Sequence, residues 1–286
     1  MPRFFDNREE LMQNGFSRNN KDGVVWLSVS AFDATGLCVT CFSTRLGGVS
    51  PSPLESMNLG FNRGDARENV LENYRRLGDA AGFASEKLVA FSQIHESGVC
   101  IATEADAGEA FLPEKRKFDA VVTNVPHLPI ATYHADCTPI FLLDPIKKAV
   151  GVAHAGWRGT AKRCPAAAVE AMVKNYGCNP RDILAAIGPA IGKCCFETDG
   201  DVPEEMIKGF GSAAAPHIDD IGGGRYRVSL SGLNRETLLE CGIREENITV
   251  DESCTCCENS FFWSHRATKG IRGTMAAVIC LEGDAK

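Results

Sequence analysis

The sequence of 286 residues has no long apolar run and no excess of positive charge. Its hydrophobic stretches are too short to cross a bilayer, and its amino terminus lacks the apolar core of a signal peptide. The formal net charge of -7 provides no general attraction to nucleic acid or to an anionic membrane. We therefore expect a cytoplasmic protein that binds neither. No pattern in the chain predicts its oligomeric state.

Histidine is also scarce, with 6 residues, whereas cysteine is frequent, with 13. An odd number of cysteines in a chain expected in the cytoplasm indicates reduced thiols and not a disulfide framework. The adjacent pair Cys194 and Cys195 is expected to pack as small hydrophobic side chains. A second, structural metal at Cys254, Cys256 and Cys257 is the less favoured alternative for the later cysteines.

Short β-rich runs and helical patterns follow one another in mixed order. The helices are predicted at 65–82, where Asp65 and Glu68 have the spacing of a capping box, at 164–177 and at 230–242. The order predicts one α/β domain with a mixed β-sheet covered by helices, an α-β sandwich. The predicted strands lie within 36–44, 87–94, 118–124, 128–137, 139–145, 149–156, 182–188, 225–230, 248–253 and 276–281.

Three potential metal ligands follow strand-like runs directly. They are His95, Cys137 and His154, and strand ends are where α/β proteins usually assemble their sites. Two imidazoles and one thiolate suit Zn²⁺ and leave a fourth position open for water or substrate. For each residue taken alone, a role in the core or in a loop is the alternative.

Seven motifs follow one another along the chain. They are "STRLGGVS" (43–50), "SQIHESGV" (92–99), "DAVVTN" (119–124), "HADCTPIFLLDP" (134–145), "GVAHAGWRGT" (151–160), "IGPAIG" (187–192) and "FFWSHR" (261–266). In this order they resemble the motifs of the YfiH/LACC1 family of multicopper polyphenol oxidase-like proteins. The resemblance begins near residue 25, so it implies an N-terminal extension over 1–24 and a catalytic domain over 25–286.

In that family the ligands are the histidine of Gln-x-His, the cysteine of Ala-Asp-Cys and the histidine of His-Ala-Gly-Trp-Arg-Gly. The resemblance places them on His95, Cys137 and His154. Two positions depart from the family pattern. Glu96 replaces a glycine and is expected at the surface, with general acid/base action as the alternative. His134 replaces a small residue and is expected to support the site, with proton transfer or competing ligation as the alternatives.

The resemblance implies a zinc enzyme that acts on purine nucleosides. The implied activities are phosphorolysis of adenosine, inosine, guanosine and methylthioadenosine, which is a transferase reaction, and deamination of adenosine, which is a hydrolase reaction. Zinc would acidify water for deamination, whereas phosphorolysis needs cations for phosphate. Arg45 is the expected phosphate ligand because a guanidinium binds phosphate through two hydrogen bonds.

Further residues are assigned more general roles around the same site. Cys137, His154, Arg45 and Asp136 form the expected catalytic set, in which Asp136 either orients a ligand or acts as acid or base. Trp157 is expected to pack beneath the site. The residues expected to bind substrate, besides Arg45, are Asn58, Gln93, Arg158 and Arg266.

Two other enzyme classes and a non-enzymatic binding module remain as alternatives. A copper-dependent, laccase-like polyphenol oxidase is disfavoured because multicopper oxidases use paired His-x-His segments, and this sequence contains none. A cysteine hydrolase would use Cys137 as nucleophile and His154 as base. Zinc and cysteine chemistry exclude each other in the resting enzyme, because a metal-held thiolate is a poor free nucleophile.

Overall fold

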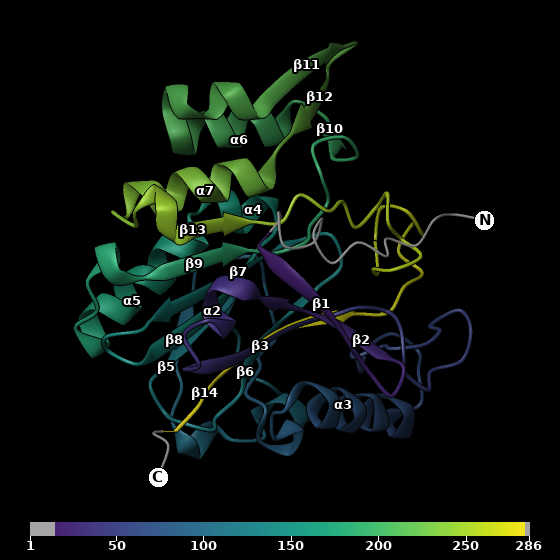
Figure 1. Cartoon of the computed structure of the whole chain (residues 1–286). Coiled ribbons are helices and arrows are strands. Elements are labelled where there is room, and N and C mark those ends of the chain that lie inside the picture. The colour runs from purple at the N-terminus through teal and green to yellow at the C-terminus, as the bar shows by residue number, and fades with distance from the viewer. Residues whose placement is uncertain (1–14, 284–286) are drawn as a thin grey trace.

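Two packed β-sheets form the centre of the chain in the computed structural model, which describes residues 15–283 (Figure 1). All strand pairs of the five-stranded sheet are antiparallel. Its order is β1 (Phe16–Lys21), β2 (Val24–Val29), β3 (Cys38–Ser43), β14 (Met275–Leu281) and β6 (Ile130–His134). Because β1 pairs with β2 along its whole length, the sheet already begins ahead of residue 25.

The six-stranded sheet is mixed, with parallel pairs at its two edges and antiparallel pairs in the middle. A third, three-stranded sheet lies beside helix α6 (Asp201–Phe210; Figure 1). The six-stranded order is β13 (Ile248–Val250), β9 (Leu184–Ile187), β7 (Thr138–Asp144), β8 (Ala149–Ala155), β5 (Ala120–Thr123) and β4 (Val99–Ile101), and the three-stranded order is β10 (Glu197–Thr198), β12 (Arg225–Val228) and β11 (Ile218–Gly222).

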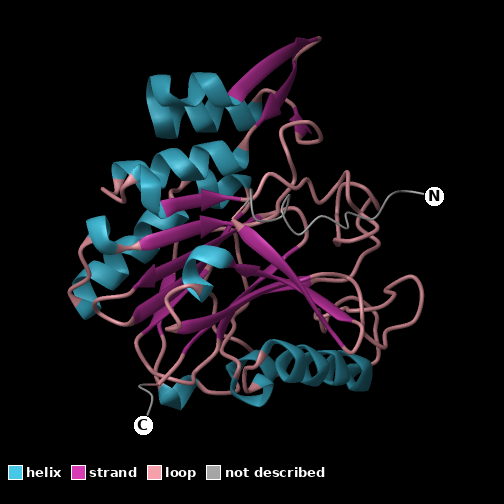
Figure 2. Cartoon of the chain, viewed as in Figure 1, coloured by secondary structure: helices cyan, strands magenta, loops and turns pink. Residues whose placement is uncertain are grey.

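Helices cover the outer faces of the two large sheets (Figure 2). Helix α3 (Arg67–Ala81) packs on the five-stranded sheet. Helices α5 (Cys164–Tyr176) and α7 (Leu230–Glu240) pack on the six-stranded sheet. This is the predicted single α/β domain, although it contains two packed sheets where the sequence indicated one. The helices are α2 (Ser30–Asp33), α3 (Arg67–Ala81), α4 (Trp157–Ala161), α5 (Cys164–Tyr176), α6 (Asp201–Phe210) and α7 (Leu230–Glu240).

The side chains of the central strand β7 alternate between the two faces of its sheet, and both faces are covered, so every residue of the strand is buried. Phe141 and Leu143 point into the core between the two sheets, and Ile140 and Leu142 point toward α5 and α7. This explains why its sequence is an uninterrupted apolar run. The strand begins at Thr138, directly after Cys137, so the packed core fixes the position of a predicted ligand.

Two helix predictions are confirmed and one detail of a third is wrong. Helix α5 has a proline in its first turn and ends at Gly177, whose φ of 66° is left-handed. Helix α7 also occupies its predicted range. Helix α3, however, begins after Ala66 without a side-chain cap. The Asp65 carboxylate accepts hydrogen bonds from the side chains of Asn58 and Asn69 instead.

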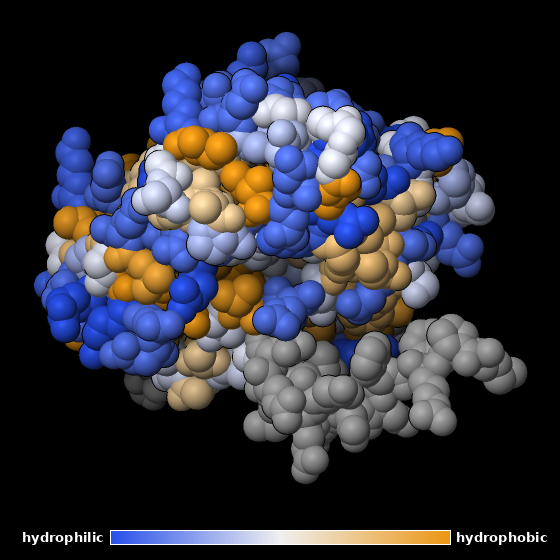
Figure 3. All heavy atoms as spheres, turned by 90° about the horizontal axis from the view of Figure 1, so that it is seen from above, coloured by the Kyte–Doolittle hydropathy of each residue, from blue (hydrophilic) through white to orange (hydrophobic). Residues whose placement is uncertain are grey.

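The segment 87–94, predicted as a strand, forms only isolated bridges through Val89 and Ser92. Its last residue, Ile94, donates its N–H to the Asp119 carboxylate, directly before β5. Within residues 15–283, no helix is long and apolar enough to span a membrane. The face at the α6 and β11 end is mostly hydrophilic, with apolar residues in small groups (Figure 3).

We expect Phe141→Ala to lower the free energy of unfolding by about 3–5 kcal/mol, because it opens a cavity between the sheets. Ile146→Ala is the control, since Ile146 lies just beyond β7 and is 66% exposed. That change should cost less than about 0.5 kcal/mol. Urea unfolding measures both variants, and equal losses would contradict this account of the core.

Candidate metal centre and active-site cavity

The buried carboxylate of Asp119 organises the loop that carries His95. It accepts backbone N–H hydrogen bonds from Ile94, His95 and Glu96 at 3.1, 3.0 and 2.9 Å. These bonds hold His95 in a left-handed conformation with φ of 61°, which is uncommon for a residue with a side chain. Asp119 immediately precedes β5, so the sheet fixes the carboxylate that fixes the loop.

The same carboxylate orients His154. Its Oδ1 atom accepts a hydrogen bond from His154 Nδ1 at 3.0 Å, so the other ring nitrogen, Nε2, is free of this bond. The backbone also joins the two residues, since His154 N–H donates to the Asp119 carbonyl at 2.8 Å. A carboxylate on the far nitrogen of an imidazole is the usual support of a metal-binding histidine.

Cys137 lies in the turn between β6 and β7, and His134 supports its backbone. His134 Nδ1 donates to the Cys137 carbonyl at 3.0 Å. Because Nδ1 carries that proton, Nε2 accepts the bond from the Thr132 hydroxyl at 2.8 Å. Burial holds the pKa of His134 well below its usual range. His134 is therefore neutral and has both ring nitrogens engaged within the protein.

The three predicted ligands converge. One ligand atom each from His95, Cys137 and His154 lies within 4.8 Å of the others, and Cys137 Sγ is 4.0 Å from His95 Nε2. Gly156 makes this approach possible. A Cβ atom there would lie 2.8 Å from Cys137 Sγ and 2.9 Å from His95 Cδ2. Two imidazoles and a thiolate at this spacing fit a zinc ion with one position left for a reactant.

The charges of the site favour the thiolate. Burial by itself raises the pKa of Cys137, but the positive charge and hydrogen bond of His154, together with His95, lower it to about 6. Burial lowers the pKa of His154, yet the Cys137 thiolate and Asp119 raise it to about 9. Without a metal, Cys137 and His154 are therefore an ion pair near neutral pH. Metal binding would release the His154 proton.

A cavity of about 280 Å³ opens beside these three residues. Aromatic side chains form part of its wall, and three cations reach it. Its lining residues are Leu59, Gly60, Phe61, Asn62, Arg63, Phe91, Ser92, Gln93, His95, Lys115, Tyr133, His134, Ala135, Cys137, His154, Arg272 and Thr274.

Arg272 and Arg63 form a positive region in the cavity. No carboxylate of residues 15–283 forms an ion pair with either guanidinium, although the charges of Cys137 and Asp136 act on Arg272. Both guanidinium groups donate to the Thr274 hydroxyl, at 3.1 and 3.2 Å. The Nε atom of Arg272 is buried and has no hydrogen-bond partner. Burial, then the charge of Arg63, lower the pKa of Arg272 to about 10. An anion at this point would satisfy both groups.

The structure brings Gln93 to the cavity but leaves Arg45 outside its lining. The Gln93 amide accepts from Tyr133 N–H and donates to the Tyr133 carbonyl at 2.8 Å, which fixes its orientation. Arg45 stacks over Trp263 at 4.0 Å and donates to the carbonyls of Glu55 and Asn259. Arg45 therefore joins two loops in this structure.

The other predicted arginines also lie outside the cavity lining. Arg158 stacks over the Trp157 ring at 4.1 Å. Trp157 packs against the cluster formed by α6 and its neighbours, so it supports the helix that follows His154. Arg266 donates from its side chain to the carbonyls of Cys195 and Glu197.

Asn58 and Asp136 are buried and hydrogen-bonded within the protein. Asn58 donates to Gly60 and Asp65 and accepts from Gly60 and Thr274, so it shapes the loop that carries Arg63. Asp136 accepts from the Thr255 hydroxyl and the Arg266 backbone, each at 2.7 Å. It adjoins Cys137 but does not line the cavity.

Glu96 forms an ion pair with Lys162 at the surface, as expected for this departure from the family pattern. The residues that sequence reasoning missed are Asp119 and the three cavity cations. Asp119 stands inside the quoted motif "DAVVTN", which was the one available signal for it. Arg63, Lys115 and Arg272 stand in no motif, so only the fold reveals that they meet.

Comparison with known proteins agrees with the motifs. Residues 39–282 match the family described as multi-copper polyphenol oxidoreductase laccase. The chain belongs to this family.

Relatives from bacteria and mammals share this similarity. The chain is 35% identical to the purine nucleoside phosphorylase YlmD of Geobacillus stearothermophilus, over 89% of this chain and 93% of the relative. It is 37% identical to the purine nucleoside phosphorylase YfiH of Escherichia coli, over 84% of this chain and 93% of the relative. The purine nucleoside phosphorylase LACC1 of Mus musculus is 37% identical, over 78% of this chain and 51% of the relative.

Solved structures confirm the fold. The crystal structure of YlmD from Geobacillus stearothermophilus superposes with a TM-score of 0.89 and 32% identity, covering 94% of this chain and 100% of that chain. YfiH from Bacillus licheniformis superposes with a TM-score of 0.88 and 33% identity, at the same coverage. This protein therefore shares its fold with these two proteins.

We expect Asp119→Asn to lower zinc affinity by about 10–100-fold, the usual effect of losing a group that orients a ligand. The amide keeps only one acceptor oxygen. It therefore loses either the bonds from His95 N–H and His154 Nδ1 or the bonds from the N–H groups of Ile94 and Glu96 that shape the His95 loop. Affinity is measured by competition with a chromophoric chelator.

Asp144→Asn is the matched control for this substitution. Asp144 is also buried and accepts two backbone N–H bonds, but it stands at the opposite end of β7. Its substitution should leave zinc affinity unchanged. If a folded Asp119→Asn protein binds zinc with wild-type affinity, Asp119 does not orient the metal ligands.

Proposed function

We propose that this chain is a cytoplasmic, zinc-dependent purine nucleoside enzyme. In this proposal it cleaves adenosine, inosine, guanosine and methylthioadenosine with phosphate, and it also deaminates adenosine. The names of the relatives support the nucleoside and phosphate substrates. The observation that carries the proposal is the cavity, which places Arg63 and Arg272, cations without carboxylate partners, beside the His95, Cys137 and His154 group.

Phosphorolysis forms a bond between a phosphate oxygen and the ribose carbon C1′ and breaks the bond from C1′ to the purine. The purine leaves with the bonding electron pair and gains the proton that the attacking phosphate loses. Arg272 and Arg63 would hold the phosphate, and the unpartnered Nε of Arg272 would donate to it. Lys115, which lies 5.4 Å from the Phe61 ring centre and 5.5 Å from that of Tyr133, adds a third cation.

Aromatic and amide groups provide the binding surface for the purine. Phe61, Phe91 and Tyr133 line the cavity, and the held amide of Gln93 lies among them. Flat apolar rings beside a fixed polar group are the usual lining of a small-molecule site. His95, Cys137 and His154 would hold the zinc, which when bound supplies a Lewis acid that stabilises negative charge and acidifies water. Asp119 keeps His154 oriented throughout.

The decisive assay incubates zinc-loaded protein with adenosine or inosine, with and without phosphate. Phosphate-dependent release of the base supports phosphorolysis, and formation of inosine from adenosine supports deamination. Arg272→Met should raise the KM for phosphate by about 10–100-fold, the effect of losing hydrogen bonds to a charged group. The KM for the nucleoside should change much less.

Arg75→Met is the control, because Arg75 pairs with Glu72 and Asp79 on the exposed face of helix α3. Arg45→Met compares the phosphate ligand predicted from sequence with the ligand indicated by the cavity. If the KM for phosphate rises in the Arg45 variant but not in the Arg272 variant, the phosphate ligand is Arg45 and not the cavity arginines. Absence of both activities in zinc-loaded protein would overturn the proposal.

One observation favours a second function, that of a cysteine hydrolase. Cys137, His154 and Asp119 have the arrangement of nucleophile, base and orienting acid, with the Cys137 pKa lowered to about 6. A copper oxidase has less support. Only one of the two possible metal-ligand groups among residues 15–283 contains histidine, whereas a multicopper enzyme requires several histidine-rich sites.

Alkylation separates the zinc enzyme from the cysteine hydrolase. In chelator-treated protein, iodoacetamide should modify Cys137 with a midpoint near pH 6, because the reactive thiolate form increases as pH rises through the pKa. Cys241 is the internal control, since burial raises its pKa to about 11. Peptide mass spectrometry follows both residues.

Added zinc should protect Cys137 if this residue is a metal ligand. Persistent alkylation at saturating zinc, together with hydrolytic activity in metal-free protein, would favour the cysteine hydrolase.

A further inference from the structure

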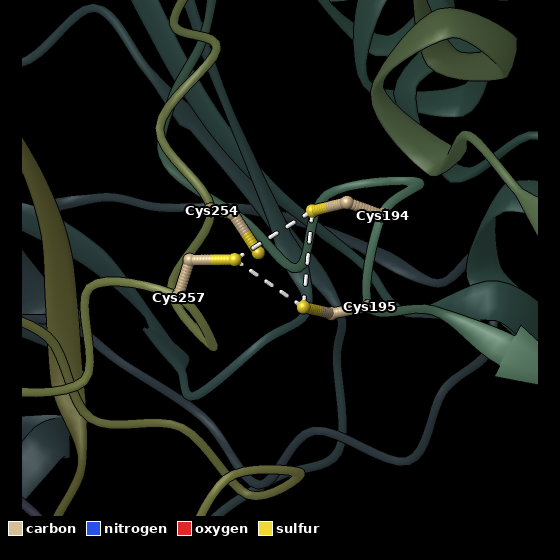
Figure 4. A group of neighbouring side chains, drawn as sticks. All are labelled: Cys194, Cys195, Cys254 and Cys257. Atoms are coloured by element: carbon tan, nitrogen blue, oxygen red, sulfur yellow. Dashed lines mark hydrogen bonds between the residues drawn. The ribbon is translucent and has the colours of Figure 1, made fainter.

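A second group of sulfur atoms lies outside the cavity. Cys194 and Cys195 follow β9, and Cys254 and Cys257 belong to the segment after β13. Figure 4 shows the four side chains pointing toward a common centre from two loops. The expectation that Cys194 and Cys195 pack as small hydrophobic side chains is wrong, since Cys194 is exposed and Cys195 only partly buried. Cys256, included in the alternative metal set, is not in the group.

The spacing of the sulfur atoms matches a tetrahedral metal site. Cys195 Sγ and Cys257 Sγ are 3.4 Å apart, Cys194 Sγ and Cys257 Sγ are 3.7 Å apart, and Cys194 Sγ and Cys195 Sγ are 3.8 Å apart. All four ligand atoms lie within 4.8 Å of one another. Four sulfurs at about 2.3 Å from a zinc ion are separated by about 3.8 Å in a regular tetrahedron.

Gly192 lies directly beside two of these sulfur atoms. Gly192 N–H points at Cys254 Sγ at 3.2 Å, and such N–H groups stabilise metal-bound thiolates. A Cβ atom on Gly192 would lie 3.1 Å from Cys194 Sγ and 3.3 Å from Cys254 Sγ. The close approach of the two loops therefore depends on a glycine at this position.

The segment that carries Cys254 and Cys257 has no helix or strand of its own between β13 and β14. Segments of this length without regular structure need other contacts to hold them, and a metal is one such device. Disulfides fit the arrangement less well. A disulfide needs two sulfurs at about 2.05 Å, and here several sulfurs are nearly equidistant.

We propose that Cys194, Cys195, Cys254 and Cys257 bind a structural zinc ion, separate from the ion expected at His95, Cys137 and His154. Four thiolates complete the coordination of zinc, so this site has no open position for a reactant. Its role is to join the loop after β9 to the segment after β13. The proposal is independent of the reaction that the cavity performs.

The joined loops support the wall of the cavity through Asp136. Thr255 lies between two of the cysteines, and its hydroxyl donates to Asp136 Oδ1 while its N–H donates to Ala190. Ile191 N–H donates to the Asp136 carbonyl at 2.9 Å. Both loops thus hold the residue that precedes Cys137.

Metal content tests the proposal directly. Protein purified under reducing conditions without chelator should contain one more equivalent of zinc than the double variant Cys195→Ser, Cys257→Ser. Cys256→Ser is the matched control, since this thiol lies in the same loop but outside the group, and it should keep the wild-type zinc content. The difference of one equivalent holds whether or not the cavity site is loaded, so failure here is distinguishable from failure of the proposed function.

Cobalt provides a readout that does not depend on the double variant folding. In a His95→Ala protein, which lacks a ligand of the cavity site, one equivalent of Co²⁺ should give the intense visible absorption of a tetrahedral cobalt–thiolate centre. No such band, an unchanged zinc content in a folded double variant, or disulfides among these four cysteines in the unreduced native protein would each overturn the proposal.

Discussion

Four hydrogen bonds to one buried carboxylate hold the candidate metal centre together. Asp119 Oδ1 accepts from His95 N–H and His154 Nδ1, and Oδ2 accepts from Ile94 and Glu96. A carboxylate with no solvent exposure is costly unless such bonds satisfy it. The same hydrogen bonds therefore stabilise the buried charge and set the geometry of the two histidines. Burial opposes ionisation, but these bonds bring the pKa of Asp119 below its usual value.

The backbone at the site is held in conformations that its residues rarely adopt alone. His95 has φ of 61°, and Asp136, just before Cys137, has φ of 87°. Each is fixed by bonds from other elements, His95 by the Asp119 carboxylate and Asp136 by Thr255, Arg266 and Ile191. Residues held this way gather at functional sites, where the surroundings determine the conformation. Two of the three ligands thus depend on distant parts of the chain.

This dependence explains how much the sequence could predict. His95, Cys137 and His154 were accessible because motifs mark them, and α5 and α7 because local signals start and stop helices. The prediction of a capping box at Asp65 is wrong because the Asp65 carboxylate accepts hydrogen bonds from the side chains of Asn58 and Asn69. Arg272 could not be placed, since β14, which follows it, lies in the sheet opposite β7 and only packing brings it beside Cys137. Contacts between remote segments leave no pattern in either segment.

Asp136 connects the two sulfur-containing sites and has a role that the chemistry of carboxylates alone does not indicate. Both of its oxygens are engaged, one by Thr255 from the four-cysteine segment and one by the backbone of Arg266. An acid or base that exchanges protons with a substrate needs a free oxygen facing that substrate, and Asp136 does not line the cavity. It is better understood as a positioning residue. The outer loops fix Asp136, and Asp136 in turn fixes Cys137, the next residue in the chain.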